Sequence, residues 1–399
     1  MVLLPVQPLS MYSFKPIRSA AVDWLAAREG CESTIVRRIG NGSVEPLPCI
    51  HRSGETTMNA AQSQLSLLAA IIRSAVLHPA VQVAAALWIV ANVAVVLLAG
   101  GVLPFDRPAL ADMPFVQQVA LPSLGLIEVF ALMAVVYVLT GRRVIPDLAA
   151  RAPGRAQSAR ETTLLLGYAG LGQLGGWLVG PALGYRPFSF HIAGTVVGCG
   201  VPPSVGELWT WAIYNFVVFA VVPHLWFRRR YSAAQLNLRS INRTNDLLVI
   251  VVVAVIESLV ELGAFPGIFQ LSARQLLIAA PLAFGVFMIG TVLPTMVLIY
   301  AILIPRYLKL TGSSATTVIL GGVTYAAMHI VEGWSVFTTP RDIALSLIFV
   351  VLQYFGPGMM KTVITLRTGN AWVHAIAYHA IPPHVVVDTP LVVKVFGLR

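Results

Sequence analysis

Tyr325-Ala-Ala-Met-His329 ends one long apolar segment of the chain, and Thr368-Gly-Asn-Ala-Trp-Val-His-Ala-Ile-Ala-Tyr-His379 leads into another. Each stretch places a histidine among residues that carry almost no charge. An ionisable side chain inside an apolar helix is costly unless it faces a cavity or a partner, so it marks a candidate functional site. His329 and His379, on helices separated by a third, are therefore the strongest functional signal in the sequence.

The composition predicts a membrane protein. Hydrophobic residues make up 57% of the chain and charged residues 11%, and the mean hydropathy is +0.78. A soluble domain carries about a quarter charged residues, so we expect a polytopic, all-α bundle of transmembrane helices that contacts membrane lipids. The net charge of +10 does not indicate nucleic-acid binding, because the basic residues lie in short loops between apolar segments. The three cysteines form no disulfide or zinc framework.

The chain falls into three parts. Residues 1–57 are polar, mixed in charge and without apolar periodicity. They predict either a disordered cytosolic tail or a natural start at Met58, and the second interpretation is slightly favoured. Residues 58–226 form an N-terminal transmembrane region of about four spans, and residues 227–399 form a core of about five.

Nine apolar segments are long enough to be spans, judged by roughly 17–25 residues each. Glycines between Gly167 and Gly184 suit close helix packing in the third. The segments are approximately 80–103, 116–140, 162–183, 208–226, 247–265, 276–304, 315–334, 342–360 and 370–387.

Charge predicts the orientation. Basic residues gather in the loops after the second, fourth, sixth and eighth segments, and the alternate loops carry few. Positive loops stay in the cytoplasm, so we expect the N-terminus inside and the C-terminus outside, as in a bacterial cytoplasmic membrane. The basic residues are Arg142, Arg143, Arg151, Arg155, Arg160, Arg228, Arg229, Arg230, Arg239, Arg243, Arg306, Lys309, Lys361 and Arg367.

Short motifs resemble those of the CPBP family, the CAAX-protease and bacteriocin-processing membrane proteins that include type II CAAX prenyl endopeptidases. Tyr325-x-x-x-His329 resembles the family's FxxxH motif. Thr368-Gly-Asn-Ala-Trp, followed by His379, is similar to its last helix, which usually reads HxxxN. The basic linker from Phe227 to Leu238 is similar to the one that often precedes the family core.

The resemblance covers roughly residues 227–387 and implies an intramembrane peptidase. In such members a glutamate of an EExxxR motif activates water, while two histidines assist it and support the oxyanion. This chain departs from that pattern. The glutamate positions fall near Met296 and Val297, the arginine position falls near Ala301, and Pro383 stands where HxxxN has its asparagine.

Glu257 and Glu261 are the candidates to replace that glutamate. Counted from the cytoplasmic ends of their helices, Glu257 lies about 15 Å deep and Glu261 about 21 Å deep, on one helix face. By the same count His329 lies about 21 Å deep and His379 about 14 Å deep. The four side chains thus share one layer of the membrane, and we expect them to cluster around one polar cavity.

Structural roles compete with these functional ones. Buried histidines and glutamates also serve as hydrogen-bond partners between helices. Glu332 shares the helix face of His329 but is expected at the outer interface. His374, His379 and His384 recur every fifth residue, which turns about 140° per step in an α-helix, so they are not expected to share a face. We expect no cofactor, although His329, His379 and one glutamate would form a His2Glu zinc set if their helices converged.

Two functions follow. The first is an intramembrane endopeptidase that cleaves membrane-associated peptides or protein tails, in which Glu257 or Glu261 activates water and His329 and His379 stabilise developing charge. The second is a catalytically inactive CPBP-like scaffold or regulator of a partner membrane protein. The missing glutamate motif favours the second, whereas the histidines and the co-layered carboxylates favour the first.

Overall fold

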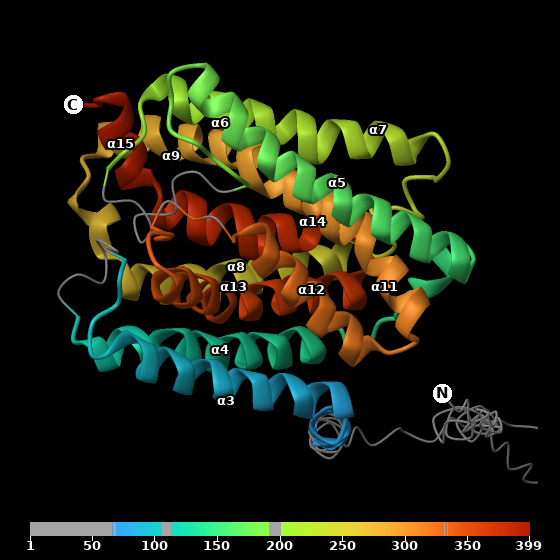
Figure 1. Cartoon of the computed structure of the whole chain (residues 1–399). Helices are drawn as coiled ribbons and strands as arrows, with labels where there is room; N and C mark the ends of the chain where they lie inside the picture. Colours follow the sequence, from blue (N-terminus) through green and yellow to red (C-terminus); the bar gives the residue numbers. More distant parts are fainter. Residues whose placement is uncertain (1–65, 67–68, 106–112, 191–200, 331, 333) are drawn as a thin grey trace, which may run out of the picture. The chain divides into compact units, whose positions relative to one another are not determined.

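A computed structural model describes residues 66, 69–105, 113–190, 201–330, 332 and 334–399 (Figure 1). Backbone contacts divide the chain into two units, Met1–Thr57 and Met58–Arg399. Residues 1–57, and with them the expectations for a tail or an alternative start, lie outside the described residues. In the described part every regular element is a helix and no strand occurs, as the all-α prediction requires.

The α-helices of more than three residues come in this order from Pro79 onward: α3 (Pro79–Ala99), α4 (Phe115–Leu139), α5 (Arg155–Ala182), α6 (Val205–Asn215), α7 (Val222–Arg228), α8 (Arg243–Ala264), α9 (Ala273–Phe287), α11 (Ile304–Thr311), α12 (Ser314–Met328), α13 (Pro340–Thr368), α14 (Ala371–His374) and α15 (Thr389–Phe396). The other elements are the π-helical segments η3 (Phe216–Val221), η5 (Met288–Val292), η6 (Met296–Leu303) and η7 (Ala375–Val387), the single turn α10 (Leu293–Thr295), and the 3-10 turns η2 (Ala149–Arg151) and η4 (Pro266–Gln270).

Six of the described helical stretches are long and apolar enough to cross a membrane. This is consistent with an integral membrane protein. Each overlaps most of one predicted span, because a run of about 20 apolar residues forms a helix that satisfies its own backbone hydrogen bonds. The six are Pro79–Ala99, Phe115–Leu139, Val205–Arg228, Arg243–Ala264, Ala273–Thr311 and Pro340–Thr368.

The other three predicted spans form helices that do not meet the same criteria. The predicted span 162–183 lies in α5, which is less apolar. The span 315–334 is shortened to α12, which has 15 residues and ends at Met328. The span 370–387 becomes α14 followed by η7. The count of nine spans is therefore not confirmed.

Prolines accompany the π-helical segments. Proline lacks an N–H, and its ring collides with the carbonyl group four residues earlier, so a wider turn with i→i+5 bonding relieves the clash. The segments η3, η5 and η6 each end two residues before a proline, at Pro223, Pro294 and Pro305. The longest, η7, contains Pro382 and Pro383. This segment lines the candidate site.

Glycines permit the closest helix contacts. A Cβ added to Gly358 of α13 would lie 2.6 Å from the Cβ of Tyr325 and 2.9 Å from the Cα of Gly322, both on α12. Such a Cβ cannot fit, so glycine is required where α12 and α13 meet. In α5, Gly172 and Gly176 likewise lie against Phe219 and Phe188. The close packing predicted for residues 167–184 is confirmed at these positions.

The basic loops meet one another. Arg143 donates hydrogen bonds to Asp246 (2.7 Å) and to the carbonyl oxygen of Thr368 (2.9 Å). Arg151 donates to Asn237 (2.6 Å) and to the carbonyl oxygen of Gly369 (2.7 Å). The loops after α4, α7 and α13 are thereby joined at one end of the helices.

Three of the basic residues counted in that pattern lie inside the protein. Arg306 is buried in an ion pair with Glu161 (2.6 Å), and the side chain of Arg143 is also buried. Lys361 was assigned to the loop before the last span, but α13 continues to Thr368 and Lys361 is 2% exposed. These three basic side chains make contacts inside the protein. The predicted membrane orientation therefore depends on the remaining basic residues, which are mostly exposed.

Candidate functional site

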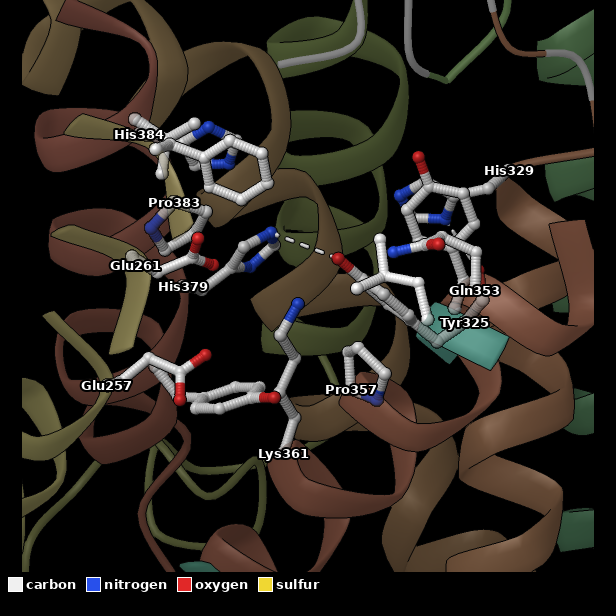
Figure 2. A pocket seen from close by; sticks show the side chains of 15 residues that line it. Glu257, Glu261, Tyr325, His329, Gln353, Pro357, Lys361, His379, Pro383 and His384 are labelled. Carbon is white, nitrogen blue, oxygen red and sulfur yellow. Dashed lines mark hydrogen bonds between the residues drawn. The ribbon is translucent and has the colours of Figure 1, made fainter. Parts of the chain in front are cut away.

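The four predicted site residues line one cavity of about 150 Å³. Glu257 and Glu261 come from α8, His329 from the end of α12, and His379 from η7. Because α8 and α9 pack against η7, and α12 packs against α13, these distant segments enclose a common space (Figure 2). The remaining lining residues are Leu121, Phe265, Tyr325, Gln353, Tyr354, Pro357, Lys361, Tyr378, Pro383, His384 and Val387.

The pocket has an acidic wall formed by Glu257 and Glu261. They stand one turn apart on α8, so both side chains reach the same side of the pocket, as Figure 2 shows. Glu257 is 7% exposed, and its Oε2 atom has no hydrogen-bond partner among the described residues. It also interacts with Glu128 of α4. The pocket therefore holds a carboxyl group that the protein leaves incompletely satisfied.

The opposite side is a donor wall formed by Tyr325, His329 and Gln353 (Figure 2). The Nδ1–H of His329 donates to the carbonyl oxygen of Tyr325 (2.7 Å), and the ring stacks on Tyr354 with centroids 4.0 Å apart. This bond makes Nδ1 a donor, so Nε2 accepts a hydrogen bond in the neutral ring and donates one in the imidazolium. The end of α12 thus fixes both the tautomer and the orientation of His329.

His379 joins the two walls. Its Nε2 atom lies 3.4 Å from the hydroxyl group of Tyr325, whereas its Nδ1 atom has no partner among the described residues. The side chain is nevertheless buried. A buried polar atom without a partner inside a cavity is a binding group for water or substrate.

His384 is a lining residue that the sequence analysis excluded. We expected His379 and His384 to point in different directions, but their ring centroids lie 5.3 Å apart and both line the pocket. The expectation was wrong because it used the turn of an α-helix. In the π-helical η7 the hydrogen bonds run from i to i+5, so residues five apart lie above one another.

An acidic partner orients His384. Its Nδ1 lies 2.8 Å from Oδ2 of Asp388, and both side chains are buried. The ring also stacks on Phe287, with centroids 4.5 Å apart and planes 4° apart. A histidine held by a carboxylate on one side and an aromatic ring on its face has a defined orientation.

Lys361 is the other site residue that sequence reasoning missed. Its Nζ lies 3.7 Å from the centroid of the Tyr325 ring, between the acidic and donor walls (Figure 2). The sequence did carry a signal for the end of this helix, namely Gly369. In the structure this glycine ends α13 in the left-handed conformation. Lys361 precedes that end by eight residues, about 12 Å, and therefore could not reach the loop.

One further expectation is corrected, for Glu332. Glu332 was expected on the helix face of His329 and at the outer interface. However, α12 ends at Met328, and Glu332 is 3% exposed. Met296 and Val297, at the positions of the missing glutamates, line a separate apolar pocket and not the pocket of the histidines.

The zinc hypothesis gains no support from the geometry. Within residues 66–399, as far as they are described, no group of three or more His, Cys, Asp or Glu side chains is arranged to hold a metal ion. His329 and His379 lie on the same cavity as the glutamates, but together they do not form the predicted His2Glu set.

The fold and the pocket define an all-helical protein with helices able to cross a membrane and a buried site of carboxyl groups, imidazoles and one lysine. No protein-family model matches the chain, and neither a curated protein nor a solved structure does.

Proposed function

We propose that the protein is an intramembrane endopeptidase of the CPBP type that cleaves membrane-associated peptides or protein tails. One observation carries the proposal: Glu257 and Glu261 face Tyr325, His329 and His379 across a single cavity. Amide hydrolysis needs a base beside the attacking water and donors beside the carbonyl oxygen. An acidic wall and a donor wall supply these two requirements.

The proposed reaction uses water and no metal. A carboxylate of Glu257 or Glu261 takes a proton from water as the water oxygen adds to the peptide carbonyl carbon. The electron pair of the carbonyl bond moves to oxygen, and this oxyanion accepts hydrogen bonds from His329 as an imidazolium and from a ring N–H of His379. The amine then leaves with the carbon–nitrogen pair and receives the proton held by the glutamate.

The alternative is a catalytically inactive scaffold. It would require the space beside the histidines to lack a base. Met296 and Val297 line another pocket, and both glutamates lie on the histidine pocket, which favours the hydrolase.

We propose that the protein lies in a bacterial cytoplasmic membrane with its N-terminus inside and its C-terminus outside. The joining of the basic loops through Arg143 and Arg151 supports one common side for them.

The test is hydrolysis of a library of palmitoylated, fluorescence-quenched peptides by the purified chain in liposomes. Glu257→Gln, Glu261→Gln, His329→Ala and His379→Ala are compared with His224→Ala, which alters a histidine of the apolar pocket. Loss of the base should lower the rate about 10²–10⁴-fold, and loss of an oxyanion donor about 10²–10³-fold. His224→Ala should cleave normally. Absence of cleavage by the unmodified chain, or equal rates in all variants, would leave the scaffold as the better explanation.

A further inference from the structure

The proposed reaction assigns no role to Lys361. Lys361 is 2% exposed and lies in the last third of α13, one of the helices able to cross a membrane. Placing a lysine there is costly, so such residues tend to pair or to face a functional cavity. Lys361 faces the cavity.

The contacts of Lys361 are incomplete. An ammonium group has three donors. Among the described residues Nζ makes no hydrogen bond; it lies over the Tyr325 ring at 3.7 Å and interacts electrostatically with Glu257. The face of the Tyr325 ring and the charge of Glu257 attract Nζ without accepting hydrogen bonds from its N–H groups. Those donors are directed into the pocket.

The polar groups around Lys361 indicate the kind of ligand that this pocket would bind. The hydroxyl group of Tyr325 and Nε2 of His379 lie 3.4 Å apart beside Lys361, so two further polar groups converge on the same region (Figure 2). A cavity of about 150 Å³ exceeds by about tenfold the space that one water needs. A compact anion with several oxygens would use the ammonium and these neighbours together, as charge-assisted hydrogen bonds do.

We infer that Lys361, with Tyr325 and His379, forms an anion subsite that takes a tetrahedral oxyanion. In the proposed hydrolysis, on which this role rests, the ligand is the oxyanion produced when water adds to the peptide carbonyl group. Lys361 thus supplies N–H donors for the oxyanion, and a positive charge when it is protonated. The subsite also binds a stable anion of the same shape, whether or not the chain cleaves peptides.

The test measures binding of octylphosphonate, a tetrahedral anion with an apolar tail, by calorimetry on the purified full chain. Lys361→Gln should weaken binding about ten- to a hundredfold, because a charge-assisted hydrogen bond is lost. Lys361→Arg should retain most of the affinity. Lys394→Gln, which removes the same charge from an exposed position on α15, should have no effect.

A second variant covers the case in which Lys361→Gln does not fold. Glu257→Gln keeps the lysine and removes the competing carboxylate, so it should bind octylphosphonate more tightly than the unmodified chain. Methylphosphonate, which lacks the tail, should show the same ranking at lower affinity. Weaker binding to Glu257→Gln would contradict the subsite.

The outcomes separate the two proposals. Binding that depends on Lys361 without any peptide cleavage would establish the subsite and reject the endopeptidase. Cleavage without phosphonate binding would reject the subsite and leave the endopeptidase standing. Equal binding by the unmodified chain and by Lys361→Gln, or binding of octylphosphonate through its tail alone, would overturn the inference.

Discussion

His379 and His384 stand five residues apart in the chain, and their ring centroids lie 5.3 Å apart. Only a π-helical turn places residues of this spacing on one side of a helix. The same turn accommodates Pro382 and Pro383, which an α-helix would tolerate poorly. The π-helical segment that contains these two prolines therefore brings a second histidine to the pocket.

Asp388 should stabilise the protein through His384. Its carboxylate accepts a hydrogen bond from Nδ1 at 2.8 Å, and alanine would leave that buried donor without this acceptor. We expect Asp388→Ala to lower the free energy of unfolding by about 1–3 kcal/mol. Asp388→Asn keeps an acceptor oxygen and should cost less. Unfolding in mixed detergent micelles measures both, and equal losses would show that the hydrogen bond is not the stabilising contact.

Arg306 should be among the most sensitive charged residues. Its guanidinium pairs with Glu161 at 2.6 Å and lies 4.7 and 4.9 Å from the ring centroids of Phe227 and Tyr231. Arg306→Met leaves the carboxylate buried without its cation, so we expect a loss of about 3–5 kcal/mol.

A double mutant separates the charge from the packing. Arg306→Met combined with Glu161→Gln should recover part of the loss, because no unpaired charge remains. The control is Arg274→Met at an exposed position of α9, which should change stability by less than about 0.5 kcal/mol. Thermal unfolding followed by circular dichroism provides the measurement. Simple additivity of the two single losses would argue against the ion pair.

Gly358 should not accept a side chain. The Cβ of alanine would lie 2.9 Å from the Cα of Gly322, a backbone atom that cannot rotate away. We expect Gly358→Ala to cost about 1–3 kcal/mol and to displace Tyr325 in the donor wall. Gly285→Ala in α9 meets nothing within 4 Å and should be neutral or stabilising. Equal thermal unfolding midpoints for the two variants would contradict the close packing of α12 and α13.

The predicted orientation, with the N-terminus inside, places three loops in the cytoplasm. Reporter fusions after Arg160, Arg243 and Lys309 should all report the cytoplasm, and a fusion after Arg399 should report the outside. The fusion after Arg243 also tests α5, because α5 must cross the membrane for that loop to lie inside. A reporter signal from the outer side at any of the first three positions would overturn the topology.

Several features could be predicted from residues alone. Apolar runs determine helices that satisfy their own backbone, so the all-α architecture and six membrane-length helices follow from local sequence. Depth along a helix is also local, because each residue adds a constant rise. The common layer of Glu257, Glu261, His329 and His379 was therefore predictable, and all four line one pocket.

Other features depended on distant contacts. Glycine at 358 allows α12 and α13 to approach, and this approach places Lys361 over Tyr325. The π-helical turn brings His384 to Asp388 and to His379. The sequence by itself determined which ionisable side chains are present and how far along their helices they lie, because these depend on composition and on the rise per residue. Only the tertiary structure decided which of them face one another, since facing depends on helix rotation and on which helices can pack closely.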